Sequence, residues 1–188
     1  MTGGRKVKRS SCAFTGHRPS KFPWGYNESD SRCANLKTAL SAQIAELANS
    51  GVTDFLSGLS EGVDIWSAIS VLELRKENPA LKLHCVLPCT GQADKWSDSA
   101  RELYDWTLDQ ADSRIYVNRE PTRNCMMERN RFMVDHAEVL LAVCKNVSER
   151  RGGTAATIRY AQKSGKEIIL LDPLTLSVTH ERSVPDPR

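Results

Sequence analysis

The chain has 188 residues, of which 40% are hydrophobic and 26% are charged, which are the proportions of a globular protein rather than a disordered or fibrous one. Lysine and arginine total 26 against 23 aspartate and glutamate, and four of these cations stand in the first ten residues, so the rest of the chain is nearly neutral. This balance argues against a broad nucleic-acid-binding surface. No apolar run approaches the roughly 20 residues that span a bilayer, so a membrane partner is not expected.

Six short apolar runs predict β-strands, and segments of helical periodicity alternate with them. The expected strands are residues 11–14, 53–57, 81–87, 113–117, 139–144 and 167–172, and the expected helices are residues 31–49, 64–76, 92–110, 122–137 and 154–164. Strand followed by helix, repeated along the chain, predicts an α/β fold: a Rossmann-like open parallel sheet with helices on both faces. We expect a single domain at 11–173, a basic N-terminal leader at 1–10 and a polar C-terminal tail at 174–188.

Six cysteines are spread along the chain without a CxxC pair. His84, Cys85 and Cys89 form the only cluster that suggests zinc, and no second ligand pair has a matching spacing. We therefore expect buried thiols, no metal site and a reduced, cytoplasmic protein.

Ligands of open α/β sheets bind beyond the carboxyl ends of the strands, so the loops that follow the expected strands are the candidate binding loops. Several of them contain glycine and small hydroxyl residues and lead into an expected helix. Arg150 and Arg151 stand immediately before the last of them. The expected ligand-binding residues in these loops are Gly16, His17, Arg18, Ser57, Gly58, Gly62, Asp64, Gly152, Gly153 and Thr154.

This composition is typical of phosphate binding. Glycine lets the backbone approach an anion closely, and a helix start presents unpaired N–H groups and the positive end of the helix dipole. Ser57, Ser60 and Thr154 add hydroxyl donors, and Arg18 adds charge. Any strand-to-helix turn favours glycine and a capping hydroxyl, so one such loop alone does not distinguish a ligand-binding loop from an ordinary turn. Two of them at one edge of a sheet, with arginines beside them, favour a ligand.

A helix expected before the fifth strand carries Arg129 and Asn130. An arginine at this place reaches across the cleft to a phosphate or carboxylate, or it belongs to a solvated helical face, and periodicity leaves both open. No GxGxxG motif follows the first strand, and no GxxxxGK[ST] motif occurs, which argues against ordinary dehydrogenases and P-loop nucleotide hydrolases.

Three side chains near the first loop have two possible roles each. Trp24 and Tyr26 lie in a polar loop, where either ring is a candidate for stacking on a base. His17 either donates a hydrogen bond to a phosphate or caps the loop internally, and the sequence does not choose.

Four motifs in this order resemble the YpsA-like family of the SLOG superfamily, which is named for the Smf/DprA and LOG proteins. The motifs are residues 15–19, 57–66, 129–135 and 152–161, and the resemblance extends over about residues 10–173. It implies a Rossmann-like fold, a bacterial or phage source and a pocket for a nucleotide or nucleotide-derived small molecule, with no further cofactor. Relatives of this kind are commonly dimers or larger, so a homo-oligomer is open.

LOG proteins in this superfamily are phosphoribohydrolases, which cleave the N-glycosidic bond of nucleoside 5′-monophosphates. By similarity to their helix motif, Arg129 stands at their catalytic arginine position. Their catalytic glutamate falls on Thr157 or Arg159 here, so another carboxylate would have to serve, and the candidates are Asp64, Glu61 and Glu128. Asp64 starts a helix, and we favour electrostatic support of that helix over catalysis.

DprA proteins, the other relatives, bind single-stranded DNA, and residues 57–64 resemble one of their motifs. The neutral body of the chain and Glu61 within that loop argue against a long phosphate backbone as partner. The sequence therefore predicts recognition of a small nucleotide ligand. A nucleotide N-glycosidase is the alternative, and single-stranded DNA binding is a weaker one.

Overall fold

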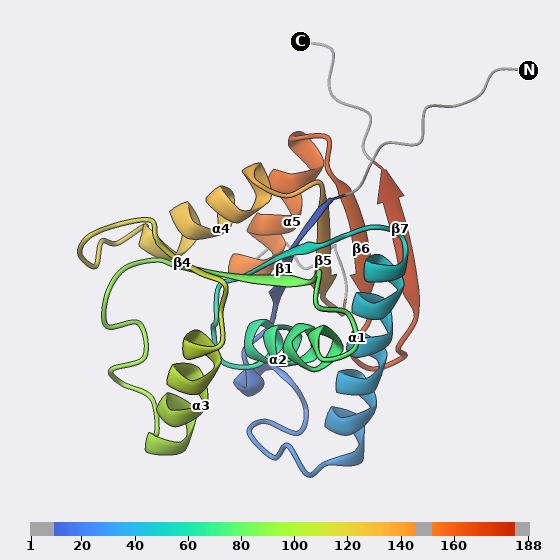
Figure 1. The fold of residues 1–188 in the computed structure, drawn as a ribbon. Helices are drawn as coiled ribbons and strands as arrows, with labels where there is room; N and C mark the ends of the chain where they lie inside the picture. The colour runs from blue at the N-terminus through green and yellow to red at the C-terminus, as the bar shows by residue number, and fades with distance from the viewer. Residues whose placement is uncertain (1–9, 146–151, 183–188) are drawn as a thin grey trace, which may run out of the picture.

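Figure 1 shows the computed structural model of the protein, which describes residues 10–145 and 152–182. These residues form one seven-stranded sheet, five α-helices and a short 3₁₀ helix, η1 (Pro19–Lys21). The strand order is β4-β3-β2-β1-β5-β6-β7. The strands are β1 (Ser11–Gly16), β2 (Asp54–Ser57), β3 (Lys82–Leu87), β4 (Ser113–Tyr116), β5 (Val139–Val143), β6 (Glu167–Leu171) and β7 (Val178–Arg182).

The strands β1 to β6 coincide with the six apolar runs, and all of them pair in parallel. In this register Cys12 of β1 lies opposite Phe55 of β2 and Val139 of β5. Every residue of β5 is buried, because helices cover both faces of the sheet at its centre. The predicted Rossmann-like α/β fold is thereby confirmed.

The helices are α1 (Ser31–Asn49), α2 (Val63–Arg75), α3 (Asp98–Asp109), α4 (Cys125–Asp135) and α5 (Gly153–Lys163). Two of them begin later than predicted, α3 at Asp98 rather than at 92 and α4 at Cys125 rather than at 122. The hydroxyl of Ser97 accepts a hydrogen bond from the Ala100 N–H at 3.3 Å and caps α3, so the chain before it forms turns.

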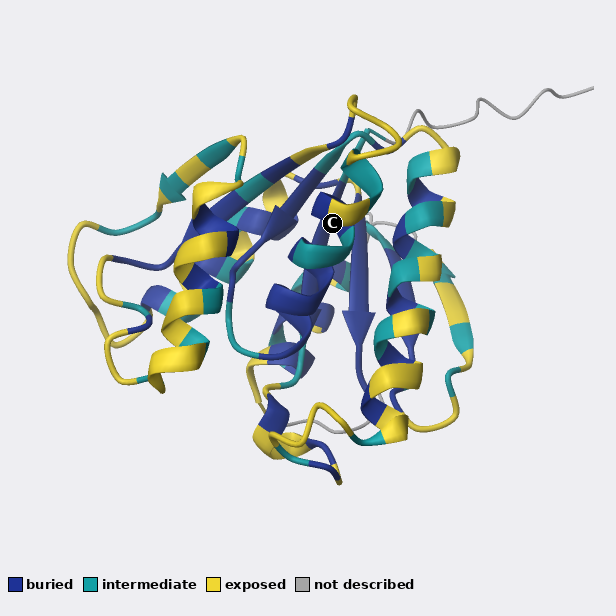
Figure 2. Ribbon diagram, turned by 60° about the horizontal axis from the view of Figure 1, so that its bottom comes forward, coloured by how far each residue is buried: buried dark blue, intermediate teal, exposed yellow. Residues whose placement is uncertain are grey.

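Two hydrophobic clusters fill the two sides of the sheet. The larger one contains the buried residues of α1, α2 and α3, and the smaller one those of α4 and α5. Figure 1 shows the same division, with α4 and α5 on one side of the strands and α1, α2 and α3 on the other. In Figure 2 the central strands are buried, while α1 and α3 carry exposed residues on their outer sides. The fold is therefore a three-layer arrangement that leaves the ends of the strands accessible.

The sheet extends further than predicted. Residues 174–188 were expected to form a polar tail, but β7 (Val178–Arg182) pairs antiparallel with β6. Its residues are exposed or half-buried, because an edge strand covers the core only on one side, so its sequence lacks a continuous apolar run. Leu176 and Val178 anchor this segment on the larger cluster. The expected leader, apart from Ser10, and the last six residues lie outside the described residues.

Candidate functional site

A cavity of about 500 Å³ lies at the carboxyl ends of β1 and β5, and we call it the switch-point cavity. The chain runs outward from β1 to β4 and then returns to place β5 on the other side of β1, so the strand order reverses here. Open α/β sheets bind ligands at such a point. The cavity is lined by Thr15, Gly16, His17, Arg18, Ser20, Lys21, Ser60, Asp64, Met126, Arg129, Asn130, Gly152, Gly153 and Thr154.

The loop after β1 forms one wall. A Cβ at Gly16 would lie 2.5 Å from the Cβ of Val63, so glycine at this position allows β1 and α2 to approach each other. Arg18 and Lys21 are exposed and line the cavity. Within the described part of the chain, neither side chain forms a hydrogen bond or ion pair. Both positive charges are therefore available to a ligand.

Three residues of the loop between β2 and α2, predicted to bind the ligand, support the loop without lining the cavity. The fully buried Ser57 hydroxyl donates to the backbone carbonyl of Asp64 at 2.8 Å and accepts from the N–H of Leu59 at 3.2 Å. A Cβ at Gly58 would lie 2.0 Å from Nη1 of Arg129. Gly62 precedes α2 with φ of 91°, a conformation that favours glycine.

Arg129 and Asp64 bring opposite charges into the buried side of the cavity, at 2% and 6% exposure. Burial raises the pKa of the Asp64 carboxyl, and the charge of Arg129 and hydrogen bonds from Ser60 oppose that rise. Burial likewise lowers the pKa of Arg129, and Asp64 opposes that change. The two groups therefore stabilise each other in an environment that disfavours either charge alone.

Most donors of the Arg129 guanidinium are used within the protein. Nη1 donates to the carbonyls of Gly58 and Val86, Nη2 to the Ser60 hydroxyl at 3.1 Å, and Nε to Oδ1 of Asn130 at 2.8 Å. A guanidinium has five N–H donors, so one remains for a ligand. Arg129 thus holds the loop after β2 in place as well as lining the cavity.

The start of α5 forms the opposite wall. Gly152, with φ of 108°, and Gly153 have nothing within 4 Å of the position that a Cβ would take, so open space adjoins the helix start. A helix N-terminus with accessible backbone N–H groups attracts anions. Arg150 and Arg151, which the sequence placed beside this turn, lie outside the described residues.

The positions that the LOG resemblance assigns to a catalytic glutamate hold no carboxylate. The buried Thr157 hydroxyl donates to the Gly153 carbonyl at 2.8 Å and accepts from Nδ2 of Asn130 at 2.9 Å, which ties α4 to α5. Arg159 is exposed on α5. Among the described residues that line the cavity, Asp64 is the single carboxylate.

The structure brings nine predicted residues together around the switch-point cavity: Gly16, His17, Arg18, Asp64, Arg129, Asn130, Gly152, Gly153 and Thr154. It leaves Ser57, Gly58 and Gly62 behind the cavity wall. Sequence reasoning missed Ser20 and Lys21, which η1 turns toward the cavity. The signal for them was Pro19, since proline at the start of a helical turn positions the next residues.

The two aromatic candidates for base stacking lie elsewhere. Trp24 is buried and stacks on Phe22, with ring centroids 4.9 Å apart, so it belongs to the core. Tyr26 is 62% exposed and lines a separate cavity with Glu28 and Glu61. Neither ring lines the switch-point cavity.

The residues suggestive of zinc have other partners. His84 contacts Oδ1 of Asp54 at 2.8 Å and the Ser113 hydroxyl at 2.7 Å, and all six cysteines are buried. Within residues 10–145 and 152–182, no group of three or more His, Cys, Asp or Glu side chains is placed to hold a metal ion. None of the helices in these ranges has the length and apolar character that a bilayer crossing requires.

Comparison with known proteins identifies the family. The model of the YpsA family, described as the YspA SLOG family, matches residues 12–176. A UPF0398 protein of Bacillus velezensis is 26% identical over 154 residues, which are 80% of this chain and 82% of that protein. A UPF0398 protein of Bacillus pumilus is 31% identical over 134 residues, covering 70% of this chain and 71% of that protein. The chain therefore belongs to the YspA SLOG family, as the sequence motifs indicate.

One solved structure supports the fold. DNA processing protein A from Helicobacter pylori, described for its single-stranded DNA binding mode, matches with a TM-score of 0.57 and 20% sequence identity. The match covers 87% of this chain and 65% of the Helicobacter chain. At this identity the likeness establishes the shared fold alone.

Proposed function

We propose that this member of the YspA SLOG family binds a nucleotide or nucleotide-derived small molecule in the switch-point cavity, with no further cofactor. The observation that carries the proposal is the convergence on one cavity of the open glycine start of α5 and two cations, Arg18 and Lys21, that have no ion-pair partner among the described residues. A volume of about 500 Å³ is in the range of small-molecule sites. Six buried cysteine thiols suit a reducing compartment, and we place the function in the cytoplasm.

In this proposal the phosphate lies against Gly152, Gly153 and Thr154, within reach of Arg18 and Lys21. Backbone N–H groups at the helix start and two exposed cationic side chains suit a phosphate better than a neutral group. Asp64, with its acceptor oxygens, suits the hydroxyl groups of a ribose on the other side of the cavity. The result is recognition of the ligand, with turnover as the alternative.

One observation favours the alternative, a nucleotide N-glycosidase. Asp64 is a buried carboxylate with a raised pKa inside the cavity, which is a common property of groups that exchange protons in catalysis. Such an enzyme would use Asp64 in place of the missing glutamate. A turnover assay separates this function from recognition.

The test is proton NMR of AMP, ADP-ribose, NAD and a short single-stranded oligonucleotide, each mixed with the protein. We expect selective line broadening of at least one small nucleotide without new signals. Broadening of the oligonucleotide alone, with an affinity that falls steeply with salt, would replace the proposal by single-stranded DNA binding. Broadening of none of the four would refute nucleotide recognition.

Matched variants assign the site. Arg18→Gln and Lys21→Gln should each weaken nucleotide affinity about tenfold, the effect of losing one hydrogen bond to a charged group. Lys163→Gln removes the same charge at the far end of α5, outside the cavity, and should leave affinity unchanged. Equal effects of all three variants would mean that net charge, rather than the cavity, determines binding.

Turnover is read from the same spectra over time. Growing signals of a free base and ribose 5-phosphate that vanish with Asp64→Asn would establish the N-glycosidase. Stable spectra with an intact complex support recognition.

A further inference from the structure

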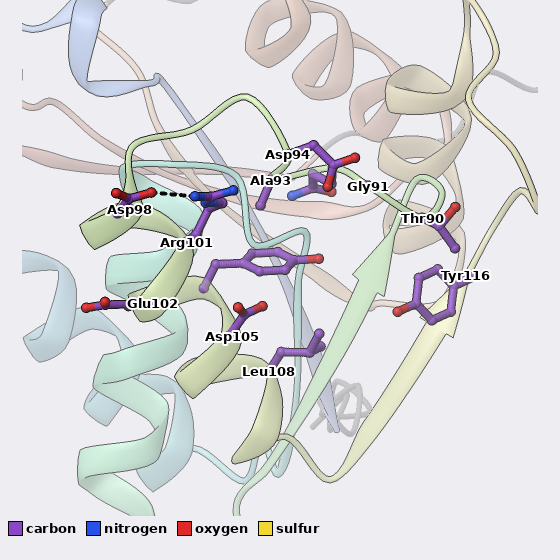
Figure 3. Close-up of a pocket in the computed structure, with 12 residues that line it drawn as sticks. Thr90, Gly91, Ala93, Asp94, Asp98, Arg101, Glu102, Asp105, Leu108 and Tyr116 are labelled. Carbon is purple, nitrogen blue, oxygen red and sulfur yellow. Dashed lines mark hydrogen bonds and ion pairs between the residues drawn. The ribbon is translucent and has the colours of Figure 1, made fainter.

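A second cavity, of about 650 Å³, lies between α3 and the ends of β3 and β4, and we call it the acidic groove. Figure 3 shows the labelled side chains of α3 on one side, Tyr116 on the other, and the turn from Thr90 to Asp94 across the end. Its base is formed by the buried residues Ala93, Tyr104 and Leu108. The groove thus has an apolar base and an exposed rim.

The rim is strongly negative. Asp94, Asp98, Glu102 and Asp105 are exposed and line the groove, against one cation, Arg101. Arg101 is already paired with Asp98 (Figure 3). The other three carboxylates, Asp94, Glu102 and Asp105, therefore have no ion-pair partner among the residues that line the groove.

The base of the groove contains hydrogen-bonding atoms without partners. Tyr104 is 7% exposed and lines the groove, and its hydroxyl has no hydrogen-bond partner in the described part of the chain. Burial raises the pKa of this hydroxyl, and the neighbouring ionisable groups that add to the rise include Tyr116 and Asp105, both on the groove wall. The hydroxyl is therefore neutral, and its side chain lines the groove. A largely buried tyrosine normally has a partner for its hydroxyl, so this hydroxyl is available to a ligand in the groove.

Gln92 supports the same interpretation. Its Nε2 donates to the carbonyls of Gly58 and Leu59, both at 3.0 Å, which fixes the orientation of the amide. Oε1 is then left buried at the groove without a partner. This unsatisfied atom is a hydrogen-bond acceptor, as are the rim carboxylates, so a ligand that fits the groove is rich in hydrogen-bond donors.

We propose that the acidic groove binds an organic cation, a guanidinium or primary ammonium group on an aliphatic stem. The stem would pack on Leu108 and the two tyrosine rings, and the head group would donate to Gln92 Oε1, the Tyr104 hydroxyl and the rim carboxylates. Tyrosine faces also attract such cations directly. A small free amine and an arginine side chain of a partner protein share this chemistry. The proposal is independent of nucleotide binding at the switch-point cavity.

The test is an NMR titration of the full-length, ¹⁵N-labelled protein with three probes. Nα-acetyl-L-arginine amide represents a side chain of a partner, agmatine represents a free amine, and Nα-acetyl-L-citrulline amide is the uncharged isostere of the first. We expect saturable shifts of the Gln92 side-chain amide with at least one of the cations, and binding of citrulline about tenfold weaker or more, because charge-assisted hydrogen bonds are lost. Tighter binding of agmatine than of the arginine derivative identifies a free amine as the ligand, and the reverse order identifies a partner's side chain.

A pair of double variants provides the control. Glu102→Gln/Asp105→Asn removes two charges from the rim and should weaken binding of the cations about fivefold or more. Glu73→Gln/Glu77→Gln removes two exposed charges near the end of α2, away from the groove, and should have no effect. Equal binding of arginine and citrulline derivatives, absence of shifts at Gln92, or unchanged affinity in the rim variant would each overturn the proposal.

Discussion

The two cavities lie at the same edge of the sheet and have opposite character. The switch-point cavity exposes Arg18 and Lys21 beside a helix N-terminus, whereas the acidic groove exposes carboxylates around tyrosines. Their linings share one hydrogen-bond acceptor, the Gly58 carbonyl oxygen, which accepts from Nη1 of Arg129 in the first cavity and from Nε2 of Gln92 in the second. One backbone turn therefore separates a surface suited to anions from one suited to cations.

The cavities also differ in how their buried polar groups are satisfied. In the switch-point cavity, the buried Arg129 is hydrogen-bonded within the protein, and Arg18 and Lys21, which have no partner among the described residues, are exposed. In the acidic groove, the buried Oε1 of Gln92 has no partner in the described part of the chain. Buried unsatisfied groups reduce stability, while exposed ones are solvated by water. Loss of the buried polar groups at the first cavity should therefore lower the free energy of unfolding, whereas loss of the Tyr104 hydroxyl at the groove should not.

The largest effect is expected for Arg129→Ala. It removes a buried cation that holds the loop after β2 and leaves Asp64 buried without its opposite charge, so the free energy of unfolding should fall by about 3–5 kcal/mol. Urea denaturation measures this change. Arg131→Ala on the same helix removes an exposed guanidinium that lies over Tyr160 and should cost less than about 1 kcal/mol. Similar stability of the two variants would show that Arg129 is not the structural centre of the cavity.

Gly58→Ala tests the turn that the cavities share. The new Cβ would lie 2.0 Å from Nη1 and 2.3 Å from Cζ of Arg129, and this guanidinium is buried and held by several acceptors. We expect a loss of about 2–3 kcal/mol, the upper part of the range for overpacking, measured by urea denaturation. Gly153→Ala meets no atom within 4 Å and should not lose stability. If both substitutions are tolerated equally, the guanidinium moves aside without cost, and the two cavities are not tied through this turn.

The fold and the place of the site could be predicted because both depend on local patterns. Continuous apolar runs such as β5 identify strands buried on both faces, and the loops after parallel strands must meet at one edge of the sheet. Gly16, Arg18 and Gly153 were located by this reasoning alone, and the structure places all three around one cavity. Strand β7 was missed because its polar edge sequence resembles a tail.

Which loop residues line the cavity and which only support the loop could not be predicted, because glycine and serine are common both in turns and in anion-binding sites. The Ser57 hydroxyl is hydrogen-bonded behind the cavity wall, and Gly58 lies against the guanidinium of Arg129. Both placements depend on the orientation of the loop rather than on residue type. The carbonyls that bind Arg129 belong to Gly58 and Val86, which are 71 and 43 residues away in the sequence. The acidic groove was missed because carboxylates on α3 are typical of a solvated helix face, and Tyr116 comes from a different element.

Ser57→Ala sharpens the distinction between a supporting residue and a ligand-binding one. Its buried hydroxyl makes one donated and one accepted hydrogen bond, so their loss should lower the free energy of unfolding by about 1–2 kcal/mol. Nucleotide affinity should stay within about twofold of the unmodified protein, whereas Lys21→Gln should show the opposite pattern. Calorimetric titration and urea denaturation of the same two preparations measure both effects. A large loss of affinity with unchanged stability in Ser57→Ala would show that this hydroxyl binds the ligand rather than supports the loop.

The smallest effect on stability is expected for Tyr104→Phe. The substitution removes a hydroxyl without a hydrogen-bond partner in the described residues and keeps the ring, which packs edge-on against Trp96 at 5.4 Å between centroids. The free energy of unfolding should therefore change by less than about 0.5 kcal/mol, because a hydroxyl that water reaches and that has no partner in the protein contributes little to folding. Urea denaturation tests this, and a loss above about 1 kcal/mol would mean that the hydroxyl has a partner in solution and is not available to a ligand. A neutral result combined with weaker binding of an organic cation would separate the two roles, since a hydroxyl that contributes nothing to folding but contributes to binding is placed for the ligand.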